Sequence, residues 1–181
     1  MRPRPAPHRL AALLVVVGGL LLAPGAFAAD TMDGYRSAQF GMSADEVKSA
    51  VEDDGVTIVT VHETDDGDTL LDGHLDDDTE TGIRYVFPEG RDQLALVVKF
   101  HPDHNDPAPL VERLKADHGE PWADDMAEQW FEQLREDMPE GVRDLTVWGG
   151  GEGARERFVR LWVFEDYLSV EYLDINLLRG S

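Results

Sequence analysis

Hydrophobic residues recur at every second position in two runs of the chain, and this period of two is typical of β-strands. The first run covers residues 83–87 and the second covers 94–100, and a turn at 88–91 that contains proline and glycine lies between them. Two alternating runs joined by a short turn form a hairpin. We therefore predict an antiparallel β-hairpin over residues 83–100.

Further strands are predicted before and after this hairpin. Residues 56–62 are rich in β-branched side chains, and a weaker pattern marks 69–75. A short run at 144–148 precedes a glycine-rich turn, and the longer runs 158–164 and 167–175 are hydrophobic on both faces. Strands of this last kind are typical of the interior of a sheet that is covered on two sides.

Three segments show the helical period instead. Residues 43–46, Ser-Ala-Asp-Glu, form a capping box, which predicts a helix that ends near Gly55. A second helix is predicted from Asp106, a helix cap followed by proline, to Gly119. A third helix is predicted over 126–138, so that the last two form a helical hairpin.

The order of these elements is helix, strands, helix pair, strands. This order predicts the α+β class, with an antiparallel sheet and helices packed on one face. Each half of the chain has a helix, a polar strand and a long hydrophobic hairpin in the same sequence. A tandem helix-plus-β-hairpin duplication, with pseudo-repeats over 38–103 and 104–176, is therefore a hypothesis that rests on element order and not on matched residues.

The first 28 residues have the pattern of a secretory signal peptide. Three arginines precede the apolar run 10–22, and Ala26-Phe27-Ala28 forms a cleavage site of small residues. The apolar run is shorter than the roughly 20 residues that span a bilayer. We expect a single α+β domain over 29–181 that is periplasmic or secreted, with no stable membrane anchor.

Charge and composition narrow the function classes further. The chain has 37 acidic and 16 basic side chains, no cysteine, and a net charge of −21 at pH 7. Removing the three signal-peptide arginines takes this charge from −21 to −24. Nucleic acid is an unfavourable partner for such an acidic protein, and the missing cysteine excludes disulfides, thiolate metal sites and a lipid-bearing cysteine. The acidity fits halophilic adaptation, a generally acidic exported proteome, or a basic partner.

Three short motifs resemble those of a broad group of small exported bacterial proteins. They are Phe-Gly-Met-Ser-Ala-Asp-Glu-Val at 40–47, Tyr-Val-Phe at 85–87 and His-Gly-Glu-Pro at 118–121. The pattern is similar to that of the small outer-membrane-assembly lipoproteins and of the duplicated domains of the β-lactamase inhibitor protein. The resemblance covers residues 38–175 in outline. It implies helices on one face of an antiparallel sheet whose other face can meet a protein partner, and it carries over no binding residue.

An acidic stretch over 65–80 is a candidate metal site. It contains Asp66, Asp68 and Asp72 among eight carboxylates, and calcium takes six to eight oxygen ligands. The spacing does not match the helix-loop-helix calcium loop, so a solvated run of charge is the alternative. Calcium is the one cofactor that the sequence suggests.

Histidines supply a second metal hypothesis. His101 and His104 lie at the end of a predicted strand, and His62 and His74 lie near the ends of others. For hydrolysis the chain has no G-x-S-x-G elbow, no H-E-x-x-H motif and no phosphate-binding loop. We therefore expect no catalytic site, and a hydrolase is the least favoured hypothesis.

Trp122 and Trp148 are candidate partner contacts because each lies beside a turn, where a tryptophan can be exposed. The favoured interpretation is an exported binding or structural module of the bacterial envelope, which acts through protein–protein interaction. A calcium-responsive protein that uses the acidic stretch is the alternative.

Overall fold

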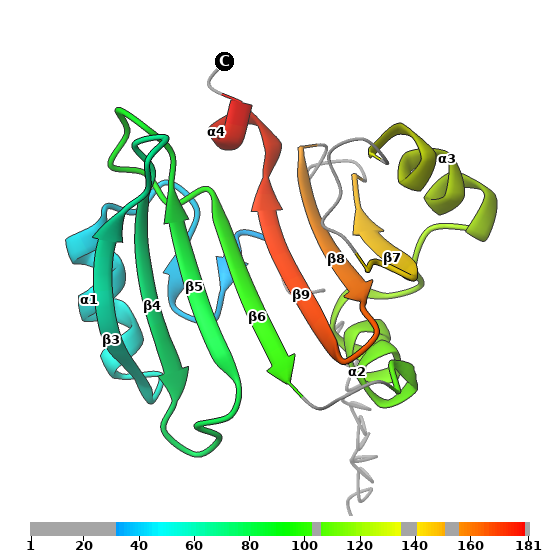
Figure 1. Ribbon diagram of the computed structural model, residues 1–181, viewed down its shortest axis with the longest axis horizontal. Helices are drawn as coiled ribbons and strands as arrows, with labels where there is room; N and C mark the ends of the chain where they lie inside the picture. Colours follow the sequence, from blue (N-terminus) through cyan, green and yellow to red (C-terminus); the bar gives the residue numbers. More distant parts are fainter. Residues whose placement is uncertain (1–31, 103–105, 135–140, 151–155, 180–181) are drawn as a thin grey trace, which may run out of the picture.

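The structure, a computed structural model, describes residues 32–102, 106–134, 141–150 and 156–179. Within these ranges, seven strands form one antiparallel sheet in the order β3-β4-β5-β6-β9-β8-β7 (Figure 1). The strands are β3 (Val56–Glu63), β4 (Thr69–Leu75), β5 (Gly82–Phe87), β6 (Leu96–Pro102), β7 (Asp144–Gly149), β8 (Arg157–Val163) and β9 (Tyr167–Asp174). The predicted α+β class with an antiparallel sheet is confirmed.

The predicted hairpin over 83–100 is present as β5 and β6, which pair in register from Gly82 opposite Phe100 to Val86 opposite Leu96. The weak strand pattern at 69–75 forms β4, an interior strand between β3 and β5. β6 and β9 pair at the centre of the sheet and join the two halves of the chain.

Helix α1 (Ala44–Glu52) begins at the predicted capping box. The Glu46 backbone N–H donates to the Ser43 hydroxyl at 3.3 Å, and the Ser43 backbone N–H donates to the Glu46 carboxylate at 2.8 Å. Hydrogen bonds from the Ser43 backbone and hydroxyl hold the pKa of Glu46 below its usual value. Past the helix, Gly55 has φ +69°, a left-handed conformation that favours glycine.

The second predicted helix is α2 (Ala108–His118). The Asp106 carboxylate accepts a hydrogen bond from the Ala108 N–H at 3.0 Å, and Gly119 ends the helix with φ +83°. Helix α3 (Asp124–Leu134) corresponds to the third prediction, whose last residues, 135–138, lie outside the described ranges. The short helix α4 (Ile175–Arg179) follows β9 directly and was not predicted.

Helices α1 and α2 supply the apolar cover of one face of the sheet. Val47 and Val51 of α1 and Leu114 of α2 belong to one buried cluster with every second residue of the strands, such as Tyr85 and Leu161. A two-stranded ribbon, β1 (Gly34–Tyr35) with β2 (Ala38–Gln39), lies on the same cluster. We call this the covered face.

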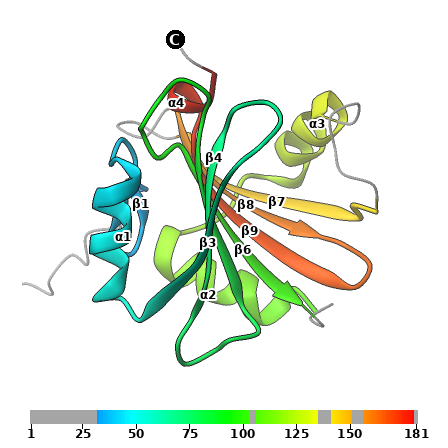
Figure 2. The same ribbon diagram turned by 60° about the vertical axis from the view of Figure 1, so that its left-hand side comes forward.

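Helix α3 occupies a different place. It contacts β7 at the edge of the sheet, far from α1 in both ribbon views (Figure 1, Figure 2). The preceding Trp122 packs with Leu145 and Phe158, and these belong to a second hydrophobic cluster, on the face opposite the covered face. The two faces of the sheet are thus packed by different segments of the chain.

Candidate functional site

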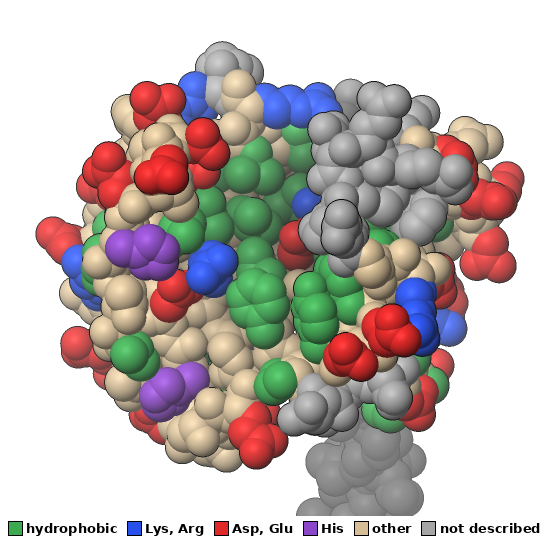
Figure 3. All heavy atoms as spheres, in the orientation of Figure 1, with side chains coloured by type: hydrophobic (Ala, Val, Ile, Leu, Met, Phe, Trp, Pro, Cys, Tyr) green, Lys and Arg blue, Asp and Glu red, His purple; other side chains and the backbone are tan. Residues whose placement is uncertain are grey.

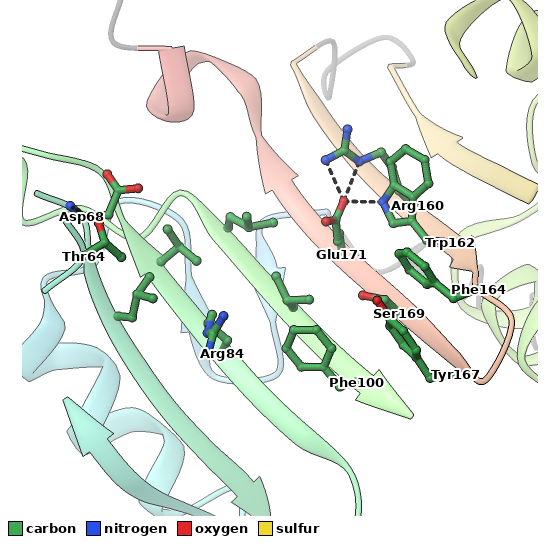
Figure 4. Close-up of a pocket in the computed structure, with 14 residues that line it drawn as sticks. Thr64, Asp68, Arg84, Phe100, Arg160, Trp162, Phe164, Tyr167, Ser169 and Glu171 are labelled. Carbon is green, nitrogen blue, oxygen red and sulfur yellow. Dashed lines mark hydrogen bonds and ion pairs between the residues drawn. The ribbon is translucent and has the colours of Figure 1, made fainter. Parts of the chain in front are cut away.

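A groove of about 560 Å³ runs over the central strands on the face opposite the covered face. Strand register explains its position, because successive side chains alternate between the faces of a sheet. In β6, Val97 and Lys99 point to the covered face, so Leu96, Val98 and Phe100 line the groove. Figure 4 shows side chains from β4, β5, β6, β8 and β9 around it.

The floor and one wall of the groove are apolar. Val86 and Val98 keep 9% and 7% of their surfaces exposed there, while Phe100 is half-buried. On the β8–β9 side, the Phe164 and Tyr167 rings stack with centroids 4.2 Å apart, next to Trp162. Figure 3 shows hydrophobic side chains gathered in this hollow, open to solvent.

Two arginines line the groove, and each is already bound to a carboxylate. Arg84 of β5 donates to both oxygens of Asp72 on β4, at 2.7 and 3.2 Å. Arg160 of β8 donates to one oxygen of Glu171 on β9, through Nε at 2.8 Å and through a terminal nitrogen at 2.6 Å. The pairs lie across neighbouring strands because their members are opposite each other in register. Their charges are neutralised within the groove.

Two polar groups in the groove retain hydrogen-bonding capacity. Glu171 Oε2 accepts both Arg160 bonds and a third from Trp162 Nε1 at 2.7 Å, whereas Glu171 Oε1 accepts none from the described residues. The Ser169 hydroxyl, on a residue only 3% exposed, also has no hydrogen bond within the described part of the chain. Figure 4 shows both side chains beside the aromatic wall. These two oxygens can orient a bound group that carries donors.

Acidic residues flank the groove. Asp68 lines one end, and its carboxylate accepts a hydrogen bond from the Glu89 N–H at 2.9 Å. At the other end, Glu165 and Asp166 form the exposed β8–β9 turn. Figure 3 shows acidic side chains on both sides of the apolar hollow. The groove therefore combines an apolar interior with a negatively charged border.

The structure does not bring the predicted calcium ligands together. Asp66 and Asp68 lie in the β3–β4 turn, whereas Asp72 lies within β4 and is bound to Arg84. An extended strand rises about 3.3 Å per residue, which puts Asp72 about 10 Å beyond the start of β4. Among the described residues, no group of three or more histidine, aspartate or glutamate side chains could hold a metal ion.

The histidines are similarly dispersed. His62 Nδ1 lies 3.8 Å from Asp72 Oδ2 on the groove side of the sheet, and His74 hydrogen bonds the Leu75 carbonyl. His101 is next to the last residue of β6 and lies on the covered face. His104, the proposed fellow ligand of His101, lies outside the described residues.

The predicted exposure of the two tryptophans was wrong for Trp148 and only partly met by Trp122. Trp148 is fully buried, and its Nε1 donates to the Gly119 carbonyl at 3.0 Å. Trp122 is half-buried, and its Nε1 donates to the Gly149 carbonyl at 2.9 Å. The reason is that the segment joining α2 and α3 lies against β7, so both rings serve to attach that segment to the sheet.

The groove is not among the sites that the sequence predicts. The signal was available in the apolar residues on both faces of 158–164 and 167–175, but we interpreted these as a sheet covered on two sides.

In the described residues, no helix is long and apolar enough to cross a membrane. Comparison of the chain with protein-family models, with curated proteins and with solved structures finds no match in any of the three.

Proposed function

We propose that this protein is a non-catalytic binding module that holds apolar side chains of a partner protein in the groove. The observation that carries this proposal is the aromatic wall of Trp162, Phe164 and Tyr167, which faces an apolar floor in a solvent-accessible hollow. Large aromatic side chains of this kind contribute most of the binding energy in many protein interfaces.

The charge around the groove indicates the composition of the partner segment. Because Asp68, Glu165 and Asp166 lie at the two ends, a segment with apolar residues in its middle and Lys or Arg on either side matches the site. Since Arg84 and Arg160 are paired within the groove, they do not offer free positive charge to an acidic segment.

Selection of peptides from a random library tests this proposal without a known partner. Peptides selected on the protein should be enriched in aromatic or aliphatic residues flanked by basic ones. A selected peptide should perturb backbone NMR signals of β6 and β9, and Phe100→Ser should weaken its binding about tenfold, which equals about 1.4 kcal/mol.

The matched control is Val59→Ser. Val59 is 65% exposed on β3 and does not line the groove, so its truncation should leave peptide affinity unchanged. Tyr167→Ser provides a second groove variant, with circular dichroism to verify folding of each. The proposal would be contradicted if the selected peptides bind both groove variants as tightly as they bind the unaltered protein. A library that yields only acidic peptides would contradict it as well.

We further propose that the protein is exported and works in the periplasm or outside the cell. The positive start, the apolar run 10–22 and the Ala-Phe-Ala site at 26–28 support this proposal. Sequencing the N-terminus of the protein recovered from the envelope fraction tests it, with Ala29 expected as the first residue. Recovery in the cytoplasm with residues 1–28 intact would refute it.

Finally, we propose that the two halves arose by tandem duplication, because the elements of each half follow in the same order. Each half has helix before strands, and the halves meet through their last strands, β6 and β9. Each also has an arginine on its penultimate strand, Arg84 or Arg160, paired with a carboxylate on a neighbouring strand. Superposing Arg84 on Arg160 should align β4–β6 with β7–β9. An alignment that places the groove face of one half on the covered face of the other would argue against duplication.

A further inference from the structure

A second cavity, of about 450 Å³, lies on the covered face between β6, β9 and α2. Lys99 of β6 is in its wall, opposite Val170 of β9 and Ile83 of β5 in strand register. Only 9% of the Lys99 surface is exposed, so its side chain is largely removed from solvent. A buried lysine without an anion is costly, since burial disfavours its charge.

Lys99 differs from the other two lysines of the chain. Lys48 pairs with Asp45 at 3.2 Å, and Lys115 lies 3.6 Å from Glu120. Within the described residues, the Lys99 ammonium makes neither an ion pair nor a hydrogen bond, and its described contact is with the Tyr35 ring, 5.0 Å from the centroid. The one deeply buried lysine is thus the one without a carboxylate partner, in a chain with 37 acidic residues.

Two arginines line the same cavity. Arg36 donates to the Asp54 backbone carbonyl at 2.7 Å, and Arg113 of α2 is exposed and forms no ion pair with the described residues. Arg36 has φ +52°, a conformation that is uncommon for a residue other than glycine. Burial first, and then the positive charges of Arg36 and Arg113, lower the pKa of Lys99 to about 8.

Acidic groups also line this cavity, at its exposed mouth. Asp77, Asp78 and Asp117 are exposed, and the Asp78 carboxylate is bound by the Thr81 hydroxyl. Asp78 raises the pKa of Lys99, but burial and the charges of Arg36 and Arg113 outweigh it, so that pKa stays below its usual value. His101, His118, Tyr35 and Tyr172 are the other titratable residues that line the cavity.

We propose that this cavity binds a small organic anion, with its carboxylate or phosphate group between Lys99, Arg36 and Arg113. Neither Lys99 nor Arg113 forms an ion pair with the described residues, so an anion there gives both a charged partner, and guanidinium and ammonium groups are the usual ligands of carboxylates and phosphates. The rings of Tyr35 and Tyr172 flank the remainder of the cavity, whose volume is that of a small-molecule site. The site is on the opposite face of the sheet from the groove, and the inference does not depend on the proposed function.

Lysine side-chain NMR tests this inference directly, because the chain has only three lysines, at 48, 99 and 115. The protein is labelled with ¹⁵N-lysine and titrated with inorganic phosphate, with succinate, and with sodium chloride at matched ionic strength. Either phosphate or succinate should raise the titration midpoint of Lys99 by one pH unit or more in a saturable manner. The midpoints of Lys48 and Lys115 should not change.

Lys99→Met should abolish the saturable response, as followed by backbone signals of β6 and α2, while Lys115→Met should retain it. Arg113→Met, at an exposed position, should weaken it severalfold without affecting folding. A response to phosphate alone or to succinate alone identifies the anionic group. The inference is overturned if neither anion moves Lys99 more than sodium chloride does, or if all three lysines shift together.

Discussion

Replacing Trp148 by phenylalanine tests how the segment between α2 and α3 is attached to the sheet. Trp148 is fully buried in the cluster that α1 and α2 cover, and its indole N–H donates to the Gly119 carbonyl at 3.0 Å. Phenylalanine keeps an aromatic ring at this position but has no N–H and is smaller. The variant therefore removes one hydrogen bond and leaves a void.

Both losses can be given a magnitude. An intramolecular hydrogen bond makes a net contribution of about 1 kcal/mol to the free energy of unfolding. The void adds about 1–2 kcal/mol, as part of the 3–5 kcal/mol that removal of a whole buried aromatic side chain costs. We expect Trp148→Phe to lower the free energy of unfolding by about 2–3 kcal/mol, which corresponds to roughly 5–10 °C in Tm for a domain of this size.

Trp122→Phe is the matched comparison. Trp122 makes the equivalent bond, to the Gly149 carbonyl at 2.9 Å, but is only half-buried, so water can occupy the space that the smaller ring leaves. This variant should cost about 1 kcal/mol. Urea unfolding followed by far-ultraviolet circular dichroism measures both variants, provided that the slope with urea concentration is unchanged. If Trp148→Phe costs no more than Trp122→Phe, burial of the indole does not determine the loss of stability.

Ser43→Ala should cost about 1 kcal/mol through loss of the α1 cap, measured by thermal unfolding, whereas Ser49→Ala at an exposed position of α1 should cost less. The pKa of Lys99 is lowered to about 8 in the folded protein, so above that pH the unfolded state binds more protons than the folded state does. The free energy of unfolding should therefore rise from pH 8 toward 10, by at most about 2–3 kcal/mol. Urea unfolding across this range measures the rise, which should be absent in Lys99→Met. Asp72→Asn should lower Tm equally in EDTA and in millimolar calcium, because its lost partner is Arg84; a loss that appears only with calcium would instead restore the calcium hypothesis.

Local signals in the sequence predicted most of the elements. The capping box at Ser43, the cap at Asp106 and the alternation around the turn at 88–91 act over a few residues, and the structure has a helix or strand at each. The ribbon of β1 and β2 was missed because strands of two residues contain no readable period. Helix α4 was missed because its first residue continues the hydrophobic run of β9.

The candidate sites could not be predicted in the same way, because they depend on which face of the sheet each helix covers. Alternation shows that β8 and β9 have two apolar faces, but it does not show that the described helices α1 and α2 pack on only one of them. The exposure of Trp148 was mispredicted for the same reason, since the covering segment is distant in sequence. Lys99 did give a signal, as the one charged residue in the run 94–100.

The position of β6 and β9 at the centre of the sheet has a consequence for the order of folding. In the seven-stranded sheet of the described residues, every other pairing joins strands that follow each other in the chain, whereas β6 must wait for β9. Such non-local pairing is slow, because the entropy of closing a long loop is lost before any contact forms. During synthesis, β6 is therefore an unpaired, apolar edge until the last strand emerges. Misassembly with another copy of the chain is most probable in that interval.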